Sequence, residues 1–311
     1  MKVAKVLKPM LCDTKIDPFN DPAWVWERKM DGIRAIITLQ GGMIKSIQAR
    51  SGEEKINLFP DIAFPTKCDC ILDGEIVART GKFNDIQHRT NRGSGIAQAA
   101  HDYPAEFIAF DVIQANGVDI TSENFQKRRE TLEALALPNA SFQISPLYDK
   151  GEELFEIACQ SAWEGIVGKR IDSRYAYGNR SPNWLKVKVW RQEVYWVVGY
   201  TPGTGWRAST FGALVLASLN GGIMKHVGEV GTGFDSAEIQ QLFARLSTTP
   251  IAAGPFHYSQ PAKWVTPFPV KIRFLELSND GIVRFPSYKG MIDPANYQAE
   301  VAAWTHNWAG K

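Results

Sequence analysis

The chain has 311 residues, of which 44% are hydrophobic and 22% are charged, a composition typical of a globular protein rather than a disordered or fibrous one. Lysine and arginine total 35 against 33 acidic residues, a formal net charge of +2, so a nucleic-acid partner would have to bind a local basic patch. The four cysteines form no C-x-x-C pair, which argues against structural zinc and against a disulfide scaffold. No stretch resembles an export signal or a membrane span, and we expect a cytoplasmic protein.

The first candidate site lies between two predicted strands. Residues 23–27 alternate between apolar and polar, and residues 33–47 have the pattern of a hairpin. The stretch KMDGIR between them puts Lys29 in a loop. Taken alone it has two interpretations. In the first, it is an ordinary turn in which Asp31 and Gly32 are chosen for their tolerance of positive φ. In the second, the turn presents Lys29 as a nucleophile while Arg34 binds a phosphate.

The rest of the first two thirds of the chain mixes short strands with helices. Strands are predicted at 70–78, 106–113, 165–170 and 184–190, and helices at 122–137 and 152–163. In the first of these helices Ser122 is the expected cap, and three apolar residues share one face. We expect one α+β domain over residues 1–189.

From residue 190 onward the pattern changes to short apolar runs punctuated by glycine and proline. Strands are predicted at 194–201, 211–219, 222–231 and 271–278. One helix, residues 236–246, interrupts them, with Ser236 as its expected cap. Several strands and one helix in about 120 residues are typical of a small β-barrel of the OB type. We expect this barrel over residues 190–311.

Charged or aromatic residues recur along the apolar runs of the first domain. An isolated charge in a protein interior is very costly, so one such residue usually has a buried partner, whereas several in order indicate a shared charged ligand. These residues are Arg50 in ARSG, Glu75 in LDGEIV, Phe110 in FIAFDVI, Glu164 and Lys169 in EGIVGK, and Lys186 and Lys188 in LKVK. The last two lie two positions apart in a strand, so they share one face.

In this order the stretches resemble the nucleotidyltransferase motifs of the ATP-dependent DNA ligases. KMDGIR matches motif I, ARSG motif Ia, LDGEIV motif III, FIAFDVI motif IIIa, EGIVGK motif IV and LKVK motif V. In the second domain, GYTPGTGWRASTFGALVLA, HVGEVGTGF and DGIVRFPSYKGM resemble the ligase module of bacterial ligase D. Several short motifs at compatible spacing are far more specific than one, so the context favours the nucleophile over the simple turn.

The resemblance implies an enzyme that uses ATP with Mg²⁺ or Mn²⁺ to form lysyl-AMP. It would transfer AMP to the 5′-phosphate of a DNA nick and let the 3′-hydroxyl displace it. Lys29 would be the nucleophile. Glu75 would lie near the ribose, and Glu75 and Glu164 would both anchor the metal. Phe110 would stack on adenine, against the alternative that it is only a core aromatic residue.

Further residues complete the nucleotide site that the resemblance implies. They are Glu27, Arg34, Arg50, Lys169, Lys186 and Lys188. The two arginines would grip AMP or the 5′-phosphate of the nick, because a planar guanidinium fits a phosphate better than an ammonium does. The three lysines would hold the α-phosphate and neutralise charge in the transition state.

Four arginines are candidates for contact with nicked double-stranded DNA, the implied partner of a monomeric enzyme. They are Arg50, Arg89, Arg92 and Arg207. For the last three the alternative is an ordinary solvated surface residue, because exposed basic residues are common. Such a ligase would serve DNA replication, repair or recombination.

One departure from the family pattern lies near the end of the second domain. The family's motif VI continues after its R-x-P-x-[FY]-x-G core with an arginine, but this chain has Ile292 at that position. Arg284 and Lys289 remain as motif VI candidates. Motif VI orients pyrophosphate while the lysine is adenylylated. The departure therefore implies that this step is slower here or relies on another basic group.

Two rival functions share some of these features. An RNA ligase or an mRNA-capping guanylyltransferase also uses K-x-D-G with a metal, although the second domain resembles DNA ligases more closely. A non-catalytic DNA-binding protein could retain the same fold. Without a ligand, such a protein would have to keep several buried charges, which is energetically unfavourable. These residues are Lys29, Glu75, Glu164, Lys186 and Lys188.

Overall fold

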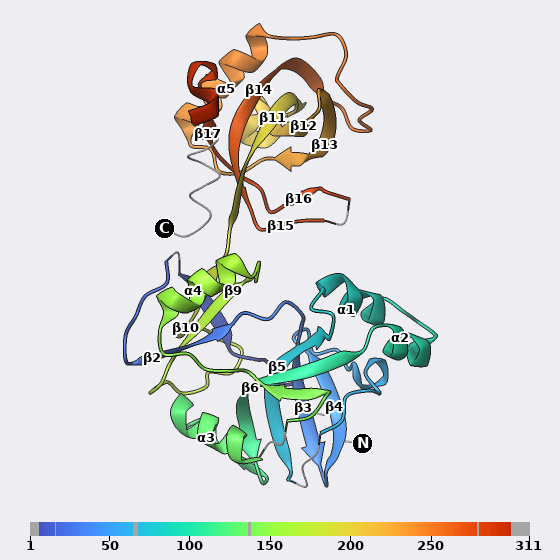
Figure 1. Cartoon of the computed structure of the whole chain (residues 1–311), viewed down its shortest axis with the longest axis vertical. Coiled ribbons are helices and arrows are strands. Elements are labelled where there is room, and N and C mark those ends of the chain that lie inside the picture. Colours follow the sequence, from blue (N-terminus) through green and yellow to red (C-terminus); the bar gives the residue numbers. More distant parts are fainter. Residues whose placement is uncertain (1–5, 16, 65–67, 136–137, 279, 300–311) are drawn as a thin grey trace. The chain divides into compact units, whose positions relative to one another are not determined.

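The computed structural model describes residues 6–15, 17–64, 68–135, 138–278 and 280–299. The chain divides into an N-terminal unit, Met1–Lys188, and a C-terminal unit, Val189–Lys311 (Figure 1). Helices and strands occur together in both units, which confirms the predicted α+β class. No described helix has the length and apolar character needed to cross a bilayer.

The larger sheet of the N-terminal unit has the order β4-β3-β5-β6-β7, with β8 paired to β6. Its strands are β3 (Ile33–Gln40), β4 (Met43–Ala49), β5 (Cys70–Ala78), β6 (Ala105–Ala115), β7 (Val118–Asp119) and β8 (Phe142–Ile144). All pairs are antiparallel except β6 with β8. In the register of β3 with β5, Arg34 lies opposite Glu75, so two predicted site residues are neighbours across the ladder.

The smaller sheet of this unit has the order β1-β10-β9-β2. Its strands are β1 (Leu11–Lys15), β2 (Trp24–Arg28), β9 (Gly165–Arg170) and β10 (Arg180–Lys188). β9 lies between β2 and β10, with Val167 opposite Glu27 on one side and Lys186 on the other. The ladder therefore brings together residues that are far apart in the sequence.

In the described residues of this unit, the helices that flank the sheets are α1 (Phe83–Thr90), α2 (Ile96–Asp102), α3 (Phe125–Leu135) and α4 (Gly151–Gln160), with a 3₁₀ turn η1 (Ile56–Leu58). The helices predicted at 122–137 and 152–163 correspond to α3 and α4, although residues 136 and 137 lie outside the described part. The expected cap Ser122 is wrong, because Asn124 Oδ1 accepts the Lys127 amide at 2.8 Å. The sequence did not predict α1 and α2.

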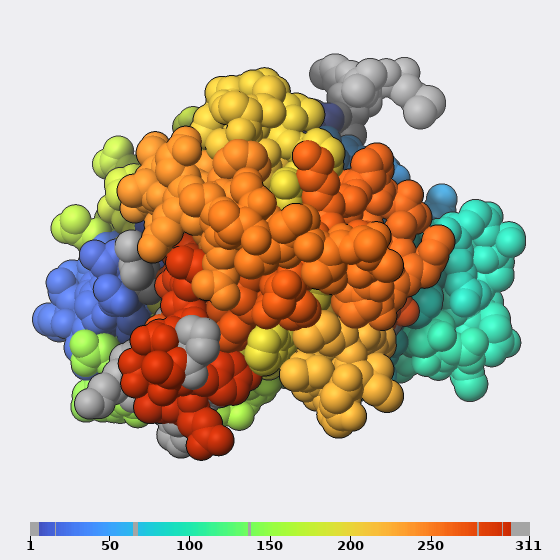
Figure 2. All heavy atoms as spheres, turned by 90° about the horizontal axis from the view of Figure 1, so that it is seen from above, coloured from blue at the N-terminus to red at the C-terminus, as the bar shows by residue number. Residues whose placement is uncertain are grey.

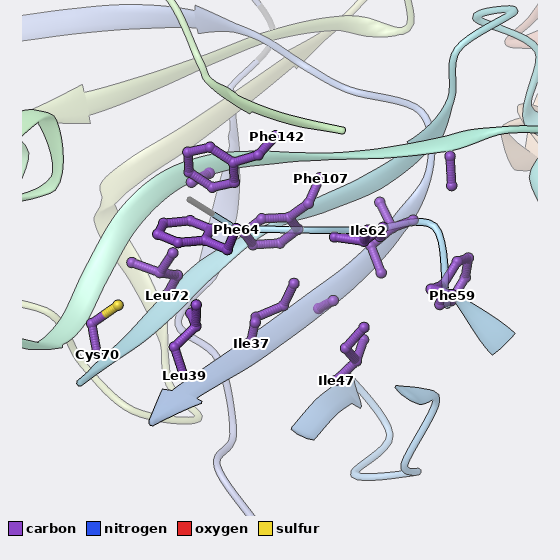
Figure 3. Packing of buried hydrophobic residues seen from close by; sticks show 14 of the residues in the cluster. Ile37, Leu39, Ile47, Phe59, Ile62, Phe64, Cys70, Leu72, Phe107 and Phe142 are labelled. Atoms are coloured by element: carbon purple, nitrogen blue, oxygen red, sulfur yellow. The ribbon is translucent and has the colours of Figure 1, made fainter. Parts of the chain in front are cut away.

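Two buried clusters occupy opposite faces of the larger sheet. On one face the rings of Phe64, Phe107 and Phe142 gather above aliphatic residues of β3 and β5 (Figure 3). The Phe64 and Phe142 ring centroids are 4.0 Å apart. On the other face Ile36 packs with Phe110 and Trp184, as expected because neighbouring residues of a strand point to opposite faces. This second cluster lies against the candidate site.

The C-terminal unit is built on an antiparallel sheet with the order β13-β12-β11-β14-β17. Its strands are β11 (Arg191–Pro202), β12 (Phe211–Asn220), β13 (Ile223–Val230), β14 (Lys263–Phe274) and β17 (Ser287–Met291), with a separate pair β15 (Glu276–Leu277) and β16 (Val283–Arg284). Short 3₁₀ turns are η2 (Gly205–Arg207) and η3 (Pro294–Asn296).

Helix α5 (Ser236–Thr248) closes the C-terminal unit and buries Ile239, Leu242 and Leu246 against the sheet. In the space-filling view the orange and red segments of this unit pack closely against one another (Figure 2). The expected cap Ser236 is wrong by one residue. Asp235 caps the helix and forms a capping box with Glu238, a pattern that satisfies two helix-end amides.

Candidate active site

A cavity of about 90 Å³ lies in the N-terminal unit between the two sheets. Seven of the predicted nucleotide-site residues line it: Glu27, Lys29, Arg34, Glu75, Phe110, Lys169 and Lys186. The other lining residues are Cys12, Arg28, Met30, Val167 and Trp184. Residues from β1, β2, β3, β5, β6, β9 and β10 thus converge on one small volume.

Lys29 follows β2, and its backbone amide donates to the Gly165 carbonyl at 2.9 Å. Its Nζ donates to the Glu164 carboxylate, the residue just before β9. The turn after Lys29 does not require positive φ at Asp31 or Gly32, contrary to the turn interpretation. Gly32 is needed for space instead, because a Cβ there would overlap the Ile76 carbonyl oxygen of β5. Close packing on β5 therefore positions the lysine loop.

Arg34 is held by a buried acid that the sequence analysis did not identify. Its Nε and Nη2 donate to the two carboxylate oxygens of Asp73 at 2.6 and 2.7 Å. Tyr175 also donates to this carboxylate, at 2.6 Å. The guanidinium lies 4.5 Å from the ring centroid of Phe110. Burial opposes the charge on Arg34, but the charge and hydrogen bonds of Asp73 outweigh it and raise its pKa.

Glu75 is a partly buried acid of the cavity whose pKa is raised. Burial raises its pKa to about 7, although Arg34 and Lys29 pull it down, and Glu164 adds to the rise by like-charge repulsion. A carboxyl with this pKa gains and loses its proton near neutral pH. Such groups cluster at sites that bind charged ligands or transfer protons.

Glu27 and Lys169 form a buried pair in the cavity wall, with Lys169 Nζ 3.0 Å from Glu27 Oε1. The same ammonium donates to the Phe110 carbonyl at 3.0 Å. Burial raises the pKa of Glu27 and lowers that of Lys169, each resisted by the opposite charge of the other. Lys169 would have to leave Glu27 to contact an α-phosphate, which weakens the role first expected for it.

Phe110 satisfies both interpretations of its role. It belongs to the buried cluster with Trp184, at a centroid distance of 6.2 Å in edge-on geometry. It also lines the cavity and has Lys169 Nζ 4.4 Å from its ring centroid. Phe110 is thus a buried core residue that also forms part of the cavity wall.

Lys186 lines the cavity from β10, and Lys188 lies two residues later on the same strand. Burial, followed by repulsion from Arg180 and Lys188, lowers the pKa of Lys186. An ammonium in this setting gains from a nearby anion. Lys188 is not among the lining residues.

Three predicted contacts lie on other surfaces of their units. Arg50 is exposed in the turn after β4, and Arg92 is exposed with its Nε donating to the His88 carbonyl at 3.1 Å. Arg207 donates from Nη1 to the carbonyls of Gly212 at 3.1 Å and Gly231 at 2.9 Å. Arg207 therefore ties its loop to β12 and to the residue that follows β13.

The structure contradicts the role predicted for Arg89. Its side chain is fully buried, and it donates to both oxygens of Asp61 at 2.7 and 2.9 Å. It also donates to the carbonyls of Leu58 and Tyr103. A guanidinium with these partners is a structural cross-link between η1 and α1. The predicted DNA contact by Arg89 is wrong, because the group does not reach the surface.

The motif VI candidates occupy different environments in the C-terminal unit. Arg284 Nη1 pairs with Glu276 Oε1 at 2.6 Å. Lys289 is exposed on β17. Ile292 is 4% exposed, and its amide donates to the Pro269 carbonyl at 3.1 Å. The residue at the position expected for arginine is thus part of the barrel interior.

The site residues missed by sequence reasoning come mostly from the flanks of the motifs. Asp73 lies two residues before Glu75 in one strand, so strand alternation could have identified it. Cys12 and Trp184 come from β1 and β10, whose pairing is not visible in the sequence. Arg28 lines the cavity next to Lys29 and stacks 4.6 Å from the Trp163 ring centroid.

Comparison with known proteins gives concordant results for both units. A family model described as "ATP dependent DNA ligase domain" matches residues 3–188, and "ATP dependent DNA ligase C terminal region" matches residues 207–293. The "Multifunctional non-homologous end joining protein LigD" of Mycolicibacterium smegmatis is 31% identical over 299 residues, which cover 91% of this chain and 38% of that protein. The chain thus spans well under half the length of this curated relative.

Two solved structures extend the comparison to the fold. The ligase domain of M. tuberculosis LigD is 27% identical, with 95% of this chain and 97% of that chain covered and a TM-score of 0.53. The mycobacterial DNA ligase D complexed with ATP and MES is 26% identical, with 93% and 95% covered and a TM-score of 0.53. These matches confirm the predicted order of a nucleotidyltransferase domain and an OB-fold barrel. The chain belongs to the ATP-dependent DNA ligase family.

Proposed function

We propose that this chain uses ATP to seal nicks between a 3′-hydroxyl and a 5′-phosphate in duplex DNA. The observation that carries the proposal is the cavity that gathers Lys29, Arg34, Glu75 and Phe110. It combines an amine nucleophile, an aromatic ring in the cavity wall and charged groups of both signs, which a nucleotide needs for binding and transfer. The related mycobacterial ligase D structure contains ATP.

In the first step Lys29 Nζ, as the free amine, attacks the α-phosphorus of ATP. A P–N bond forms, the P–O bond to pyrophosphate breaks, and the amine loses a proton. AMP then passes to the 5′-phosphate of the nick, which breaks the P–N bond and forms a P–O–P linkage. Finally the 3′-hydroxyl attacks the 5′-phosphorus and AMP leaves. Lys29 is covalently engaged only in the first two steps.

The cavity residues divide between the parts of the nucleotide. Phe110 stacks on the base, with Glu27 in the adjoining wall, and Glu75 accepts hydrogen bonds from the ribose. Lys186 and Lys188 offset the charge of the phosphates, since opposite charges in a partly buried site attract strongly. Arg34, fixed by Asp73, supports the phosphate end. Arg50 and Arg92 are the exposed candidates for DNA.

The acids of the site fit a magnesium or manganese ion. The described residues contain no cluster of three or more acidic, histidine or cysteine ligands. Mg²⁺ is commonly held by one or two carboxylates together with substrate phosphates and water, and Glu75 and Glu164 would supply those carboxylates. When bound, the ion would neutralise phosphate charge.

The two units suggest a division of labour in a monomeric enzyme. We place a nucleotidyltransferase domain over residues 1–189 and an OB-fold domain over residues 190–311. The contact boundary at Lys188 and Val189 and the two family-model matches support this division. The second domain then contributes DNA contacts and the motif VI candidates Arg284 and Lys289.

The test is incubation with labelled ATP and a singly nicked duplex, followed by gels for protein-bound AMP and for sealed DNA. Wild type is expected to give both. Lys29→Ala should lose protein-bound AMP and ATP-dependent sealing, yet seal a pre-adenylylated nick, because the amine acts before that intermediate. Label from GTP instead of ATP would favour a capping enzyme, and sealing only of RNA would favour an RNA ligase. A phosphoramidate on the Lys29→Ala protein would remove Lys29 from its role.

A further inference from the structure

Arg273 in the C-terminal unit is a cation without an acidic partner among the described residues. It lies on β14 between Ile272 and Phe274, which are both fully buried in the barrel core. Strand alternation therefore turns Arg273 to the outer face. Its guanidinium carbon lies 4.8 Å from the ring centroid of Trp190. Its Nε is buried and has no hydrogen-bond partner, an arrangement that costs free energy unless a ligand supplies an acceptor.

Polar residues from the neighbouring strands surround this guanidinium. Gln192 on β11 is opposite Arg273, and its buried side-chain oxygen also has no partner. Ser287 on β17 is opposite Arg273 on the other side. Lys289 lies two residues after Ser287 and so shares its face. Three adjacent strands thus present hydrogen-bonding or cationic groups on one patch.

The electrostatics of this patch favour an anion. Burial and repulsion by Arg273 lower the pKa of Lys289, and Glu238 opposes that change. In the described part of the chain neither cation forms an ion pair. By contrast, Arg284 of the same unit is already paired with Glu276 at 2.6 Å. Two neighbouring cations that form no ion pair, and that Glu238 only partly offsets, are stabilised when an anion binds between them.

We propose that Arg273, Gln192 and Lys289 form a phosphate-binding subsite on the C-terminal unit. Stacking on Trp190 fixes the plane of the guanidinium, so two of its N–H groups can donate parallel hydrogen bonds to one phosphate. Rotation of the Gln192 amide exchanges its oxygen for its NH₂ group, which then donates to the same phosphate. This inference rests on the proposed ligase function, which supplies two sources of phosphate: the leaving pyrophosphate of ATP and the backbone of DNA.

The experiment compares Arg273→Gln and Arg273→Lys with a matched control, Arg245→Gln. Arg245 is in the same unit and also stacks on an aromatic ring, Phe268, at 4.4 Å, but it lies outside the subsite. Three quantities are measured for each protein. They are the single-turnover rate of Lys29 adenylylation, the rate of sealing a pre-adenylylated nick, and the salt dependence of binding to nicked duplex.

If the phosphate is that of pyrophosphate, Arg273→Gln slows adenylylation at least about tenfold and leaves sealing unchanged, since positioning of a leaving group commonly counts for orders of magnitude. If it is a DNA phosphate, adenylylation is unchanged. The negative slope of log K against log salt then becomes shallower by about 0.9, because one phosphate contact is lost. Arg273→Lys recovers part of either loss, because it keeps the charge without the fork.

If the Arg273→Gln and Arg245→Gln proteins give the same adenylylation rate, sealing rate and salt dependence, the proposed phosphate subsite is wrong. If Arg273→Gln melts at a lower temperature than the control, Lys289→Gln takes its place, since that exposed side chain is removed without disturbing the core. Normal adenylylation, sealing and salt dependence in Lys289→Gln then overturn it equally. A wild-type protein that neither charges Lys29 nor seals nicks refutes the proposed function instead, so the two failures are distinguishable.

Discussion

Glu75 faces Arg34 across the β3–β5 ladder and lies in the same cavity as Lys29. The pattern LDGEIV marked it as an acid inside an apolar strand, and that unusual placement was visible in the sequence. The raised pKa of Glu75 was not visible, because it depends first on burial and then on the charges of Arg34, Lys29 and Glu164 from three other segments. Motif order can therefore identify the members of a site, while their ionisation requires the packed structure.

The raised pKa of Glu75 predicts a specific dependence of stability on pH. The folded carboxyl titrates at about 7 against an ordinary 4.5, so between these values the folded chain holds a proton that the unfolded chain has lost. The free energy of unfolding should therefore fall as pH rises from about 4.5 to 7, by at most about 3 kcal/mol from this group. Urea unfolding of wild type and Glu75→Gln across this range measures the difference. Parallel curves would mean that Glu75 has an ordinary pKa.

Arg89 shows why a basic residue in a polar stretch cannot be assigned from sequence alone. Its partner Asp61 lies 28 residues away. Arg89→Gln should lower the free energy of unfolding by about 3 kcal/mol, because it removes a fully buried guanidinium and leaves the half-buried Asp61 without its ion pair. Arg92→Gln, three residues on, should change it by less than about 0.5 kcal/mol. An Arg89→Gln protein as stable as wild type, but weaker in binding nicked DNA, would restore the original interpretation.

At the scale of elements, periodicity succeeded where an apolar face is long and failed where it is short. α5 buries Ile239, Leu242 and Leu246 at helical spacing, which made it predictable. α1 buries Ile86 and Arg89, and α2 buries Ala99. One apolar buried residue per short helix is too weak a signal. The helix starts were misplaced because several potential caps stood side by side, and only the hydrogen bonds select Asn124 and Asp235.

The end of β17 yields a prediction about the missing motif VI arginine. Ile292 is buried beside Pro269 of β14, so Ile292→Arg would place a charge in the barrel core rather than restore a phosphate contact. We expect a loss of several kcal/mol in the free energy of unfolding, on the order of 3–5, from an unpaired buried charge. Thermal melting with Lys289→Arg as the exposed control measures it. Faster Lys29 adenylylation in a stable Ile292→Arg protein would contradict this account.

At the scale of the whole molecule, the near-balance of charge hides local asymmetry. The formal charge is +2, yet Lys186, Arg273 and Lys289 each lie beside another cation. The order of the domains followed from the change of pattern near residue 190. The sequence pattern did not predict that β1 pairs with β10 or that β2 pairs with β9, because these pairs join segments more than 130 residues apart.

Binding to DNA should respond to salt in spite of the small net charge. Each phosphate contacted releases counterions, so log K for a nicked duplex should fall linearly with log salt, with a slope of about −0.9 per phosphate. Fluorescence anisotropy at several potassium chloride concentrations gives the slope. An affinity that does not change with salt would count against DNA as the substrate.

The thiol in the cavity wall gives the protein an internal chemical reporter. Cys12 lines the same volume as Lys29 and Phe110, and burial raises its pKa, so it reacts slowly with electrophiles. A nucleotide in the cavity would cover it, whereas Cys159 on α4 would remain as reactive as before. The ratio of alkylation at the two cysteines, read by mass spectrometry, therefore follows cavity occupancy in the unmodified protein without any label on the nucleotide.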